Sequence, residues 1–247
     1  MKTKERLDKL VVERGLAPSR ERARALVLAG QVLVDERVVD KVGSQIPVSC
    51  NIRIRGSDIP YVSRGGLKLE KALQVFSIDV TGRRVMDVGA STGGFTDCLL
   101  QHGASGVIAV DVGYGQLAWS LRKDERVVNF ERTNIRHLKS DDLPWKPDLA
   151  VIDASFISLE KVLPPTLELL RRPAQILALV KPQFEVGRGK VGKGGVVRDS
   201  VIHEQVLDKI RALALDLGCN IMGVDESPVL GPKGNREFLI YLRREAS

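Results

Sequence analysis

Apolar and polar residues follow two periods along this chain, one typical of strands and one typical of helices. After residue 83, short continuous apolar runs alternate with longer stretches whose apolar residues lie three or four positions apart. The runs predict strands at 84–88, 106–110, 127–130, 148–152, 175–180, 221–225 and 237–242. The longer stretches predict helices near 95–102, 115–123, 158–171 and 200–217. Continuous apolar strands separated by helices indicate an α/β fold with a mainly parallel sheet covered on both faces.

The first 60 residues show a different pattern. Apolar residues at helical spacing predict a helix over 5–14, and Ser19 is a suitable N-cap for a second helix that ends near Gly30. Three short β-branched pieces then predict strands at 32–34, 37–39 and 52–54. We therefore expect a small α+β domain at the N-terminus.

These patterns divide the chain into two domains. We expect the small domain at 1–60, a loop-like linker at 61–66 and a large α/β domain at 67–247, which begins with a helix from Leu67 to Phe76. A chain of 247 residues with 43% hydrophobic residues is long enough for one domain with a substantial core and a smaller appendage.

The net charge of +7 is concentrated in the N-terminal part of the chain. Residues 1–71 hold 15 Lys and Arg against 9 Asp and Glu, whereas the remaining residues hold 23 against 22. A basic end beside a nearly neutral body indicates a nucleic-acid-binding module, with a merely basic, solvated surface as the alternative. The three cysteines are far apart, and no apolar stretch approaches the roughly 20 residues of a membrane helix. We expect a cytoplasmic protein without disulfides or a metal site.

A glycine-rich turn at 87–95, Asp-Val-Gly-Ala-Ser-Thr-Gly-Gly-Phe, joins the first predicted strand of the large domain to a helix. Such a turn lets a ligand approach bare backbone. A dinucleotide-binding turn would need glycine where Ser91 stands, and a Walker loop would need Lys followed by Ser or Thr after Gly94. The run 187–193 matches a Walker loop only in part, because Gly194 stands where Ser or Thr is required.

S-adenosylmethionine is the third candidate ligand for this turn. Its ribose needs an acidic side chain at the end of the next strand, and Asp111 stands there, 22 residues after Gly89. The following strand leads to Asn134, which is placed to flank the adenine; the alternative for Asp111 is a simple turn residue before Gly113. We expect the cofactor to contact Asp87, Gly89, Ala90, Ser91, Thr92, Gly94, Phe95, Asp111, Val112, Asn134 and Asp153.

Four charged residues stand where this fold places chemistry. Asp153 follows the fourth predicted strand, Lys181 follows the fifth, Glu237 opens the last, and Lys68 lies at the start of the helix after the linker. The string after Asp153 is Ala-Ser-Phe, without the two prolines that amino-group methyltransferases carry here. Cys98 is better suited to packing than to nucleophilic attack on a pyrimidine.

Residues 1–60 resemble the S4 RNA-binding domain over their whole length. The similarity is carried by the strings Arg6–Val11, Ser19–Arg24 and Gly30–Val34. Arg20, Arg22 and Arg24 stand two residues apart in one predicted helix, and residues two apart do not share one face. Some of these three arginines are therefore expected to pair with Asp8 or Glu21 rather than with phosphate. Including later cationic positions, we expect RNA contacts from Arg6, Arg20, Arg22, Arg24, Arg64, Arg188, Lys190 and Lys193.

The large domain resembles the FtsJ-like ribose 2′-O-methyltransferases. Lys68, Asp153, Lys181 and Glu237 match the Lys-Asp-Lys-Glu tetrad of that family residue by residue. The strings around them are similar to the haemolysin-A (TlyA) branch, in which an S4 domain precedes the methyltransferase. The resemblance implies a Rossmann-like S-adenosylmethionine-dependent fold with a seven-stranded sheet. It also implies methylation of the 2′-hydroxyl of cytidine in ribosomal RNA.

The implied chemistry suits these residue types. A ribose 2′-hydroxyl is a poor nucleophile until it loses a proton, and neutral Lys181 is the expected general base. Burial and the nearby cation Lys68 would favour the neutral form. Asp153 and Glu237 are expected to orient the lysines and the substrate. Structural salt bridges are the alternative for each of the four residues taken singly.

The segment 185–198 is rich in glycine and cations, and we expect it to close over RNA or the cofactor, with an ordinary surface loop as the alternative. The expected partners are ribosomal RNA and ribosomal subunits, not a membrane. A non-catalytic RNA-binding or ribosome-assembly factor that retains the cofactor pocket is the second hypothesis. A membrane-lytic toxin is the third, and it has little support in the sequence.

Overall fold

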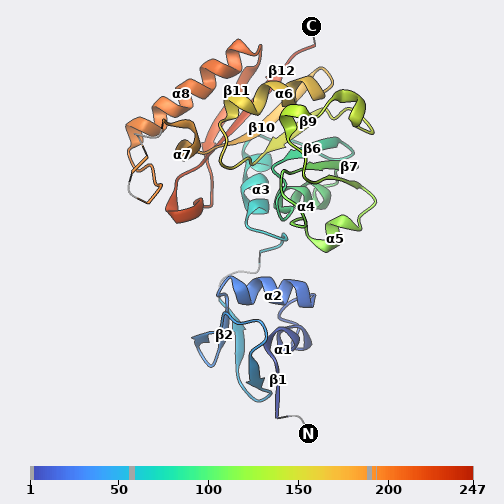
Figure 1. Cartoon of the computed structure of the whole chain (residues 1–247), viewed down its shortest axis with the longest axis vertical. Helices are drawn as coiled ribbons and strands as arrows, with labels where there is room; N and C mark the ends of the chain where they lie inside the picture. The colour runs from blue at the N-terminus through green and yellow to red at the C-terminus, as the bar shows by residue number, and fades with distance from the viewer. Residues whose placement is uncertain (1–2, 56–58, 188–190, 193, 247) are drawn as a thin grey trace. The chain divides into compact units, whose positions relative to one another are not determined.

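The computed structural model describes residues 3–55, 59–187, 191, 192 and 194–246. The chain forms two compact units, Met1–Pro60 and Tyr61–Ser247, whose elements are labelled in Figure 1. Among the described residues, no helix is both long enough and apolar enough to cross a membrane.

The first unit packs two helices against two small antiparallel sheets. Its elements are β1 (Lys4–Arg6), α1 (Leu7–Glu13), α2 (Arg20–Leu28), β2 (Val32–Val34), β3 (Arg37–Val38), β4 (Gln45–Pro47) and β5 (Ile52–Ile54). β1 pairs with β4, and β2 lies between β3 and β5. Leu7 and Leu26 are fully buried in the core between helices and strands.

Both predicted helices of this unit are found, with one difference at the start. The hydroxyl of Ser19 accepts the N–H of Arg22 at 3.2 Å, which confirms the predicted N-cap of α2. α1 begins at Leu7 instead of residue 5, because Lys4–Arg6 pairs with Gln45–Pro47 as a strand. Helical periodicity at residues 5–14 could not reveal a partner strand that lies some 40 residues later.

The second unit is a seven-stranded sheet with helices on both faces (Figure 1). Its helices are α3 (Gly65–Val75), α4 (Gly94–Gln101), α5 (Trp119–Arg122), α6 (Leu163–Leu169), α7 (Pro182–Glu185) and α8 (Ser200–Asp216). Its strands are β6 (Arg84–Val88), β7 (Gly106–Val110), β8 (Val127–Phe130), β9 (Leu149–Ile152), β10 (Ala174–Val180), β11 (Asn220–Glu226) and β12 (Phe238–Arg244). Short 3-10 helices are η1 (Ile135–His137), η2 (Ser140–Asp142), η3 (Leu159–Lys161) and η5 (Pro232–Gly234).

The strand order is β11-β12-β10-β9-β6-β7-β8. β8, β7, β6, β9 and β10 run parallel, and β12 is antiparallel to both β10 and β11. The predicted α/β fold with a mainly parallel seven-stranded sheet is therefore confirmed. The order reverses between β6 and β9, and in open α/β sheets the crevice outside the strand ends at such a point binds ligands.

Alternation along the strands explains why they read as continuous apolar runs. Met86, Ile108 and Ala150 belong to the core cluster that includes α6 and α8. Their neighbours Val85 and Val107 are equally buried and point to the opposite face, where α4 contacts β6 and β7 and packs against α3. Because both faces of these central strands are buried, apolar residues occupy almost all of their positions.

Two predicted helices are shorter than expected. α5 covers only Trp119–Arg122, and the residues before it form a loop in which Gly115 has a φ of +70°. Over 158–171, η3 precedes α6, which starts at Leu163. Pro164 and Pro165 lie in the first turn of α6, where their missing N–H groups cost no helical hydrogen bond.

Residues 61–66, expected to be a linker, pack against the second unit. Tyr61 is buried, and its hydroxyl donates to Glu70 at 2.9 Å. The N–H of Val62 donates to Asp97 of α4 at 2.7 Å. α3 starts at Gly65, two residues before the expected helix. These contacts fix the start of α3 relative to α4.

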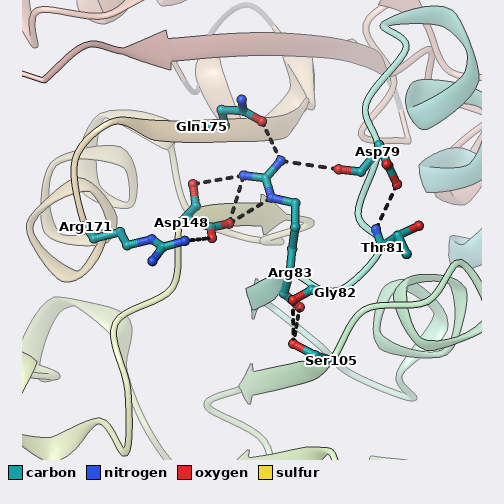
Figure 2. A network of polar contacts seen from close by, with 8 residues as sticks. All are labelled: Asp79, Thr81, Gly82, Arg83, Ser105, Asp148, Arg171 and Gln175. Atoms are coloured by element: carbon teal, nitrogen blue, oxygen red, sulfur yellow. Dashed lines mark hydrogen bonds and ion pairs between the residues drawn. The ribbon is translucent and has the colours of Figure 1, made fainter.

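A polar network joins the amino ends of the central strands, at the edge opposite the strand ends that carry the expected site (Figure 2). The guanidinium of Arg83 donates to Asp148 Oδ1 and to Gln175 Oε1, each at 2.8 Å. Arg171 pairs with the other oxygen of Asp148. The hydroxyl of Ser105 donates to the carbonyl oxygen of Gly82 at 2.8 Å. The network ties together the segments that enter β6, β7 and β9.

Asp148→Ala is expected to lower the free energy of unfolding by about 1–3 kcal/mol, because it leaves partly buried guanidinium donors of Arg83 without an acceptor. Thermal or urea unfolding of the purified variant measures the loss. Asp208→Ala is the matched control, because Asp208 pairs with Arg211 on an exposed helix surface and should change stability by less than roughly 0.5 kcal/mol. Equal losses in the two variants would show that the network does not stabilise the sheet.

Candidate active site

Two adjoining cavities open at the carboxyl edge of the sheet, beside the point where the strand order reverses. The larger cavity has a volume of about 540 Å³ and the smaller about 290 Å³. Gly89, Ser91, Asp153 and Ser155 belong to the walls of both. Because they share these residues, the two cavities form one candidate site.

The glycine turn after β6 contributes to both walls. Gly89 has a φ of +85°, and a Cβ there would lie 2.8 Å from the carbonyl oxygen of Asp153. Only glycine therefore lets this turn approach the segment after β9 so closely. Other expected cofactor contacts line the smaller cavity, namely Ala90, Thr92, Gly94 and Phe95.

Asp111 follows β7 on the wall of the larger cavity, together with Val112 and Asn134. Its Oδ2 accepts the N–H of Ser91 and its Oδ1 accepts the N–H of Gly113, each at 2.7 Å. These bonds fix the carboxylate. Since each carboxylate oxygen has two lone pairs, acceptor capacity remains for hydroxyl groups of a ligand. Apolar side chains complete the wall: Val88, Val110, Ile135, Ile157 and Val162.

Asp87 is an expected cofactor contact that the structure places outside the described walls of both cavities. It is fully buried in β6, where its Oδ2 accepts the hydroxyl of Thr96 at 2.7 Å. Burial raises the pKa of Asp87 to about 7. Asp87 therefore connects β6 to α4 behind the glycine turn. Its position in a buried strand, with the side chain directed at a helix, explains why it does not reach the cavity.

A buried chain of alternating charges lies along the smaller cavity. The Nζ of Lys68 lies 2.6 Å from Glu237 Oε2 and 3.8 Å from Asp153 Oδ2. The Nζ of Lys181 lies 2.5 Å from Asp153 Oδ1 and donates to Ser155 Oγ at 2.8 Å. The order along the chain is therefore Glu237, Lys68, Asp153, Lys181 and Ser155. With every group ionised, the four charges cancel.

Each charged member of this chain comes from a different element of the second unit. Lys68 lies on α3, Asp153 follows β9, Lys181 follows β10, and Glu237 precedes β12. The antiparallel register of β10 with β12 places Lys181 and Glu237 at the same edge. A Cβ at Gly231 would collide with Glu237 Oε1, so a larger residue there would have to displace this carboxylate.

Burial strengthens the interactions along the chain. Glu237 is 1% exposed, Lys181 6% and Lys68 9%, so water screens these charges poorly. Lys68 was expected to act on Lys181 as a neighbouring cation. The structure instead places Asp153 between the two lysines, where its negative charge offsets that effect.

The expected RNA-contacting arginines of the first unit differ in their partners. Arg20 contacts the buried carboxylate of Asp8 at 2.9 Å, which confirms the pairing expected for some of the α2 arginines, and Arg6 contacts the same carboxylate at 2.9 Å. The Arg6 guanidinium holds the pKa of Asp8 below its usual range. Arg22 donates to a backbone carbonyl near the end of the unit, and Arg24 is exposed.

Arg64 borders the smaller cavity at the start of α3. Three further expected RNA contacts lie outside the described residues: Arg188, Lys190 and Lys193. The described end of segment 185–198 is held by the side-chain amide of Asn235, which bonds the backbone at Gly195 and Val197.

Phe156 lies on the wall of the larger cavity and was not expected as a site residue. It is 90% exposed, and its backbone has a φ of +64°, which is unfavourable for a bulky residue. Its ring centroid lies 5.1 Å from that of Phe184 of α7. The sequence shows an aromatic residue after Asp-Ala-Ser, but nothing in it reveals this exposure.

Two further exposed aromatic rings lie after β7, one on the loop that partly lines the larger cavity and one at the start of α5. Tyr114 is 68% exposed, with the guanidinium of Arg132 4.1 Å from its ring centroid. Trp119 is 58% exposed, with the Nζ of Lys123 4.8 Å from its ring centroid. The periodicity of this segment predicts a helix, and nothing in that pattern indicates exposed rings paired with cations.

Two family models match the chain. The FtsJ-like methyltransferase model matches residues 61–244, and the S4 domain model matches residues 5–49. The S4 match therefore lies within the first compact unit and the FtsJ-like match within the second.

Similar proteins extend over nearly the whole chain. A Bacillus subtilis protein provisionally named an rRNA methyltransferase, YqxC, is 50% identical over 97% of this chain and 85% of its own length. The 16S/23S rRNA (cytidine-2′-O)-methyltransferase TlyA of Mycobacterium tuberculosis is 47% identical over 99% of this chain and 92% of its own. A solved structure of a provisionally named hemolysin from Streptococcus thermophilus is 47% identical, covers 99% of this chain and 90% of its own, and superposes with a TM-score of 0.78.

Proposed function

Because this chain belongs to the FtsJ-like methyltransferase family, in the haemolysin A (TlyA) group that also carries an S4 domain, we propose that it methylates the 2′-hydroxyl of cytidine in ribosomal RNA, with S-adenosylmethionine as methyl donor. The observation that carries the proposal is the buried chain from Glu237 to Lys181 on the wall of the smaller cavity. A ribose hydroxyl is a weak nucleophile, and its methylation requires a positioned base beside the donor pocket.

The larger cavity suits S-adenosylmethionine in size and in chemistry. Asp111 keeps acceptor capacity for the ribose hydroxyls, the apolar wall suits the adenine, and Gly89 lets the turn pack closely on the segment after β9 that completes the wall. When bound there, the cofactor supplies an electrophilic methyl group carried on a sulfonium. Ser91 and Asp153, which border both cavities, mark where donor and acceptor come together.

Lys181 is the proton acceptor in this proposal. Its Nζ borders the smaller cavity and is absent from the described wall of the larger one, so it meets the acceptor rather than the donor. In its neutral form the Nζ takes the proton that leaves the ribose 2′-oxygen. Asp153 holds the Nζ through a 2.5 Å contact, Lys68 lies 3.8 Å from Asp153 and offsets its charge, and Glu237 holds Lys68 at 2.6 Å.

Phe156 places the target base in this proposal. A backbone in an unfavourable conformation that presents an aromatic ring to solvent indicates a contact with another molecule. Nucleic-acid bases stack on such rings, at about 1–3 kcal/mol per base. Phe184 supports the ring from α7, directly after Lys181 in the chain, so base and ribose are held by one part of the structure.

The exposed pairs Tyr114–Arg132 and Trp119–Lys123 suit the nucleotides that flank the target. Each pair offers a ring for stacking and a cation for phosphate. The S4 unit adds exposed cations such as Arg24 for RNA contacts outside the site.

Asp111→Asn is expected to weaken S-adenosylmethionine binding by about tenfold, because a neutral amide oxygen accepts hydrogen bonds from the ribose less strongly than a carboxylate. The asparagine would also turn its NH2 group toward one of the two backbone N–H donors that the carboxylate oxygens now accept. Isothermal titration calorimetry of the variant measures the affinity. Asp208→Asn, on the surface of α8, is the control and should bind as wild type does. Wild-type affinity in Asp111→Asn would remove Asp111 from the cofactor site.

The proposed function is tested by offering the protein different acceptors with methyl-labelled S-adenosylmethionine. Intact ribosomal subunits, free ribosomal RNA, transfer RNA, DNA and unmodified protein form the panel. Label in ribosomal RNA that survives alkaline cleavage as a stable dinucleotide supports ribose methylation. RNA binding without label in any acceptor would instead indicate a non-catalytic RNA-binding factor, and label in protein or DNA would contradict the proposal.

A further inference from the structure

Ser155 contacts Lys181 and borders both cavities, yet none of the roles above uses its hydroxyl. It lies two residues after Asp153, in the segment that follows β9. Its Oγ accepts an N–H from Lys181 Nζ at 2.8 Å. The residue is exposed, whereas Lys181 is 6% exposed. The hydroxyl therefore lies between the buried amine and the open part of the site.

A charged contact with Asp153 and a hydrogen bond to Ser155 hold the Nζ of Lys181. Asp153 Oδ1 lies at 2.5 Å and Ser155 Oγ at 2.8 Å. A neutral amine carries two N–H groups and one lone pair, arranged tetrahedrally with the Cε. The 2.5 Å contact with Asp153 fixes the rotation about the Cε–Nζ bond and leaves two positions open. Ser155 then decides which of them carries the second hydrogen, so the lone pair occupies the other.

This division of labour matters because a base acts through its lone pair. Lys181 borders the smaller cavity, and the part of its Nζ that neither Asp153 nor Ser155 covers is the part that a substrate oxygen can reach. Proton transfer depends steeply on such alignment. With Asp153 alone, the second N–H and the lone pair could exchange places.

We propose that Ser155 is a positioning residue that directs the lone pair of Lys181 toward the ribose hydroxyl in the smaller cavity. The proposal rests on the proposed function, since it assigns the geometry of the same base. It gives Asp153 and Ser155 separate tasks, one setting the rotation of the amine and the other selecting the free position. It also explains why a serine hydroxyl lies at the boundary shared by the two cavities.

Three variants test this role. Ser155→Ala removes the acceptor, and Ser155→Thr keeps it, with room for the added methyl because residue 155 is exposed. Ser105→Ala is the matched control, because it removes a serine hydroxyl that bonds two carbonyl oxygens at the opposite edge of the sheet. For each variant, kcat and KM are measured with ribosomal subunits and labelled S-adenosylmethionine, and cofactor affinity is measured by calorimetry.

Ser155→Ala is expected to lower kcat about tenfold, equivalent to roughly 1.4 kcal/mol, with KM for RNA and cofactor affinity within about threefold of wild type. Ser155→Thr should recover most of the lost rate, and Ser105→Ala should keep the wild-type kcat.

Two results would overturn the assignment while the proposed function stands. One is an unchanged kcat in Ser155→Ala, and the other is a rise in KM alone, which would make Ser155 a binding contact. An absence of methyl transfer by the wild-type protein would instead reject the proposed function itself. The wild-type arm therefore separates the two failures.

Discussion

Lys181→Met is expected to reduce methyl transfer to ribosomal RNA by about 10³-fold, because it removes the group that takes the proton from the ribose hydroxyl. Methionine keeps much of the length of the lysine side chain but cannot accept a proton. The larger cavity does not include Lys181 among its described lining residues, so S-adenosylmethionine should bind with nearly wild-type affinity. Single-turnover transfer and calorimetry on the same preparation measure the two quantities.

Lys209→Met is the matched control for Lys181→Met. Lys209 lies on α8, and its Nζ is 3.0 Å from the carboxylate of Glu160. Lys209 is not among the described residues that line either cavity. Its loss should leave the transfer rate within about twofold of wild type. A Lys181→Met protein that still transfers methyl groups at the wild-type rate would show that the buried lysine is structural.

Glu237→Gln is expected to lower both stability and activity, because it leaves the buried ammonium of Lys68 without its closest counter-charge. Removing one partner of a buried ion pair costs about 3–5 kcal/mol. Lys68 has a second carboxylate within reach, Asp153 at 3.8 Å, and a closer approach to it would pull Asp153 from Lys181. We therefore expect the transfer rate to fall by about 10²-fold together with the free energy of unfolding.

A double variant separates these two losses. Lys68→Met combined with Glu237→Gln removes both charges, so stability should recover most of what Glu237→Gln loses, while activity stays low. Lys71 provides the control, since it lies on α3 like Lys68 and its Nζ is 3.3 Å from Asp225 of β11, with both side chains partly exposed. Lys71→Met should cost less than about 1 kcal/mol. Full activity in the double variant would show that only Asp153 and Lys181 are needed.

Most of the fold follows from local patterns in the sequence. The central strands β6, β7, β9 and β10 are buried on both faces and read as apolar runs. The edge strands β8 and β11 are only partly buried, but all seven strands were predicted. The misjudged boundaries have non-local or steric causes. β1 forms because Gln45–Pro47 pairs with it. α6 starts later than expected because its two prolines lack N–H groups and are tolerated only in the first turn of a helix. Residues 61–66 read as a linker since no local signal announces the bond from Val62 to Asp97.

The site was predictable where a residue type and a strand end coincide. Asp111, Asp153 and Lys181 all directly follow strands, and the structure places each on a cavity wall. Asp87 shows the limit of this reasoning, because a motif position does not reveal which way a buried side chain points. Phe156 shows the other limit, since its exposure depends on a positive φ that the sequence does not specify.

We propose that the methyl group goes to a ribose oxygen that Lys181 has deprotonated. The most direct test of this proposal is to incubate ribosomal subunits with methyl-labelled S-adenosylmethionine and either wild-type protein or Lys181→Met, digest the RNA to nucleosides and identify the labelled nucleoside by mass spectrometry. We predict label in 2′-O-methylcytidine with the wild-type protein and none above background with the variant. Label on a base, or equal labelling of 2′-O-methylcytidine by both proteins, would contradict the account.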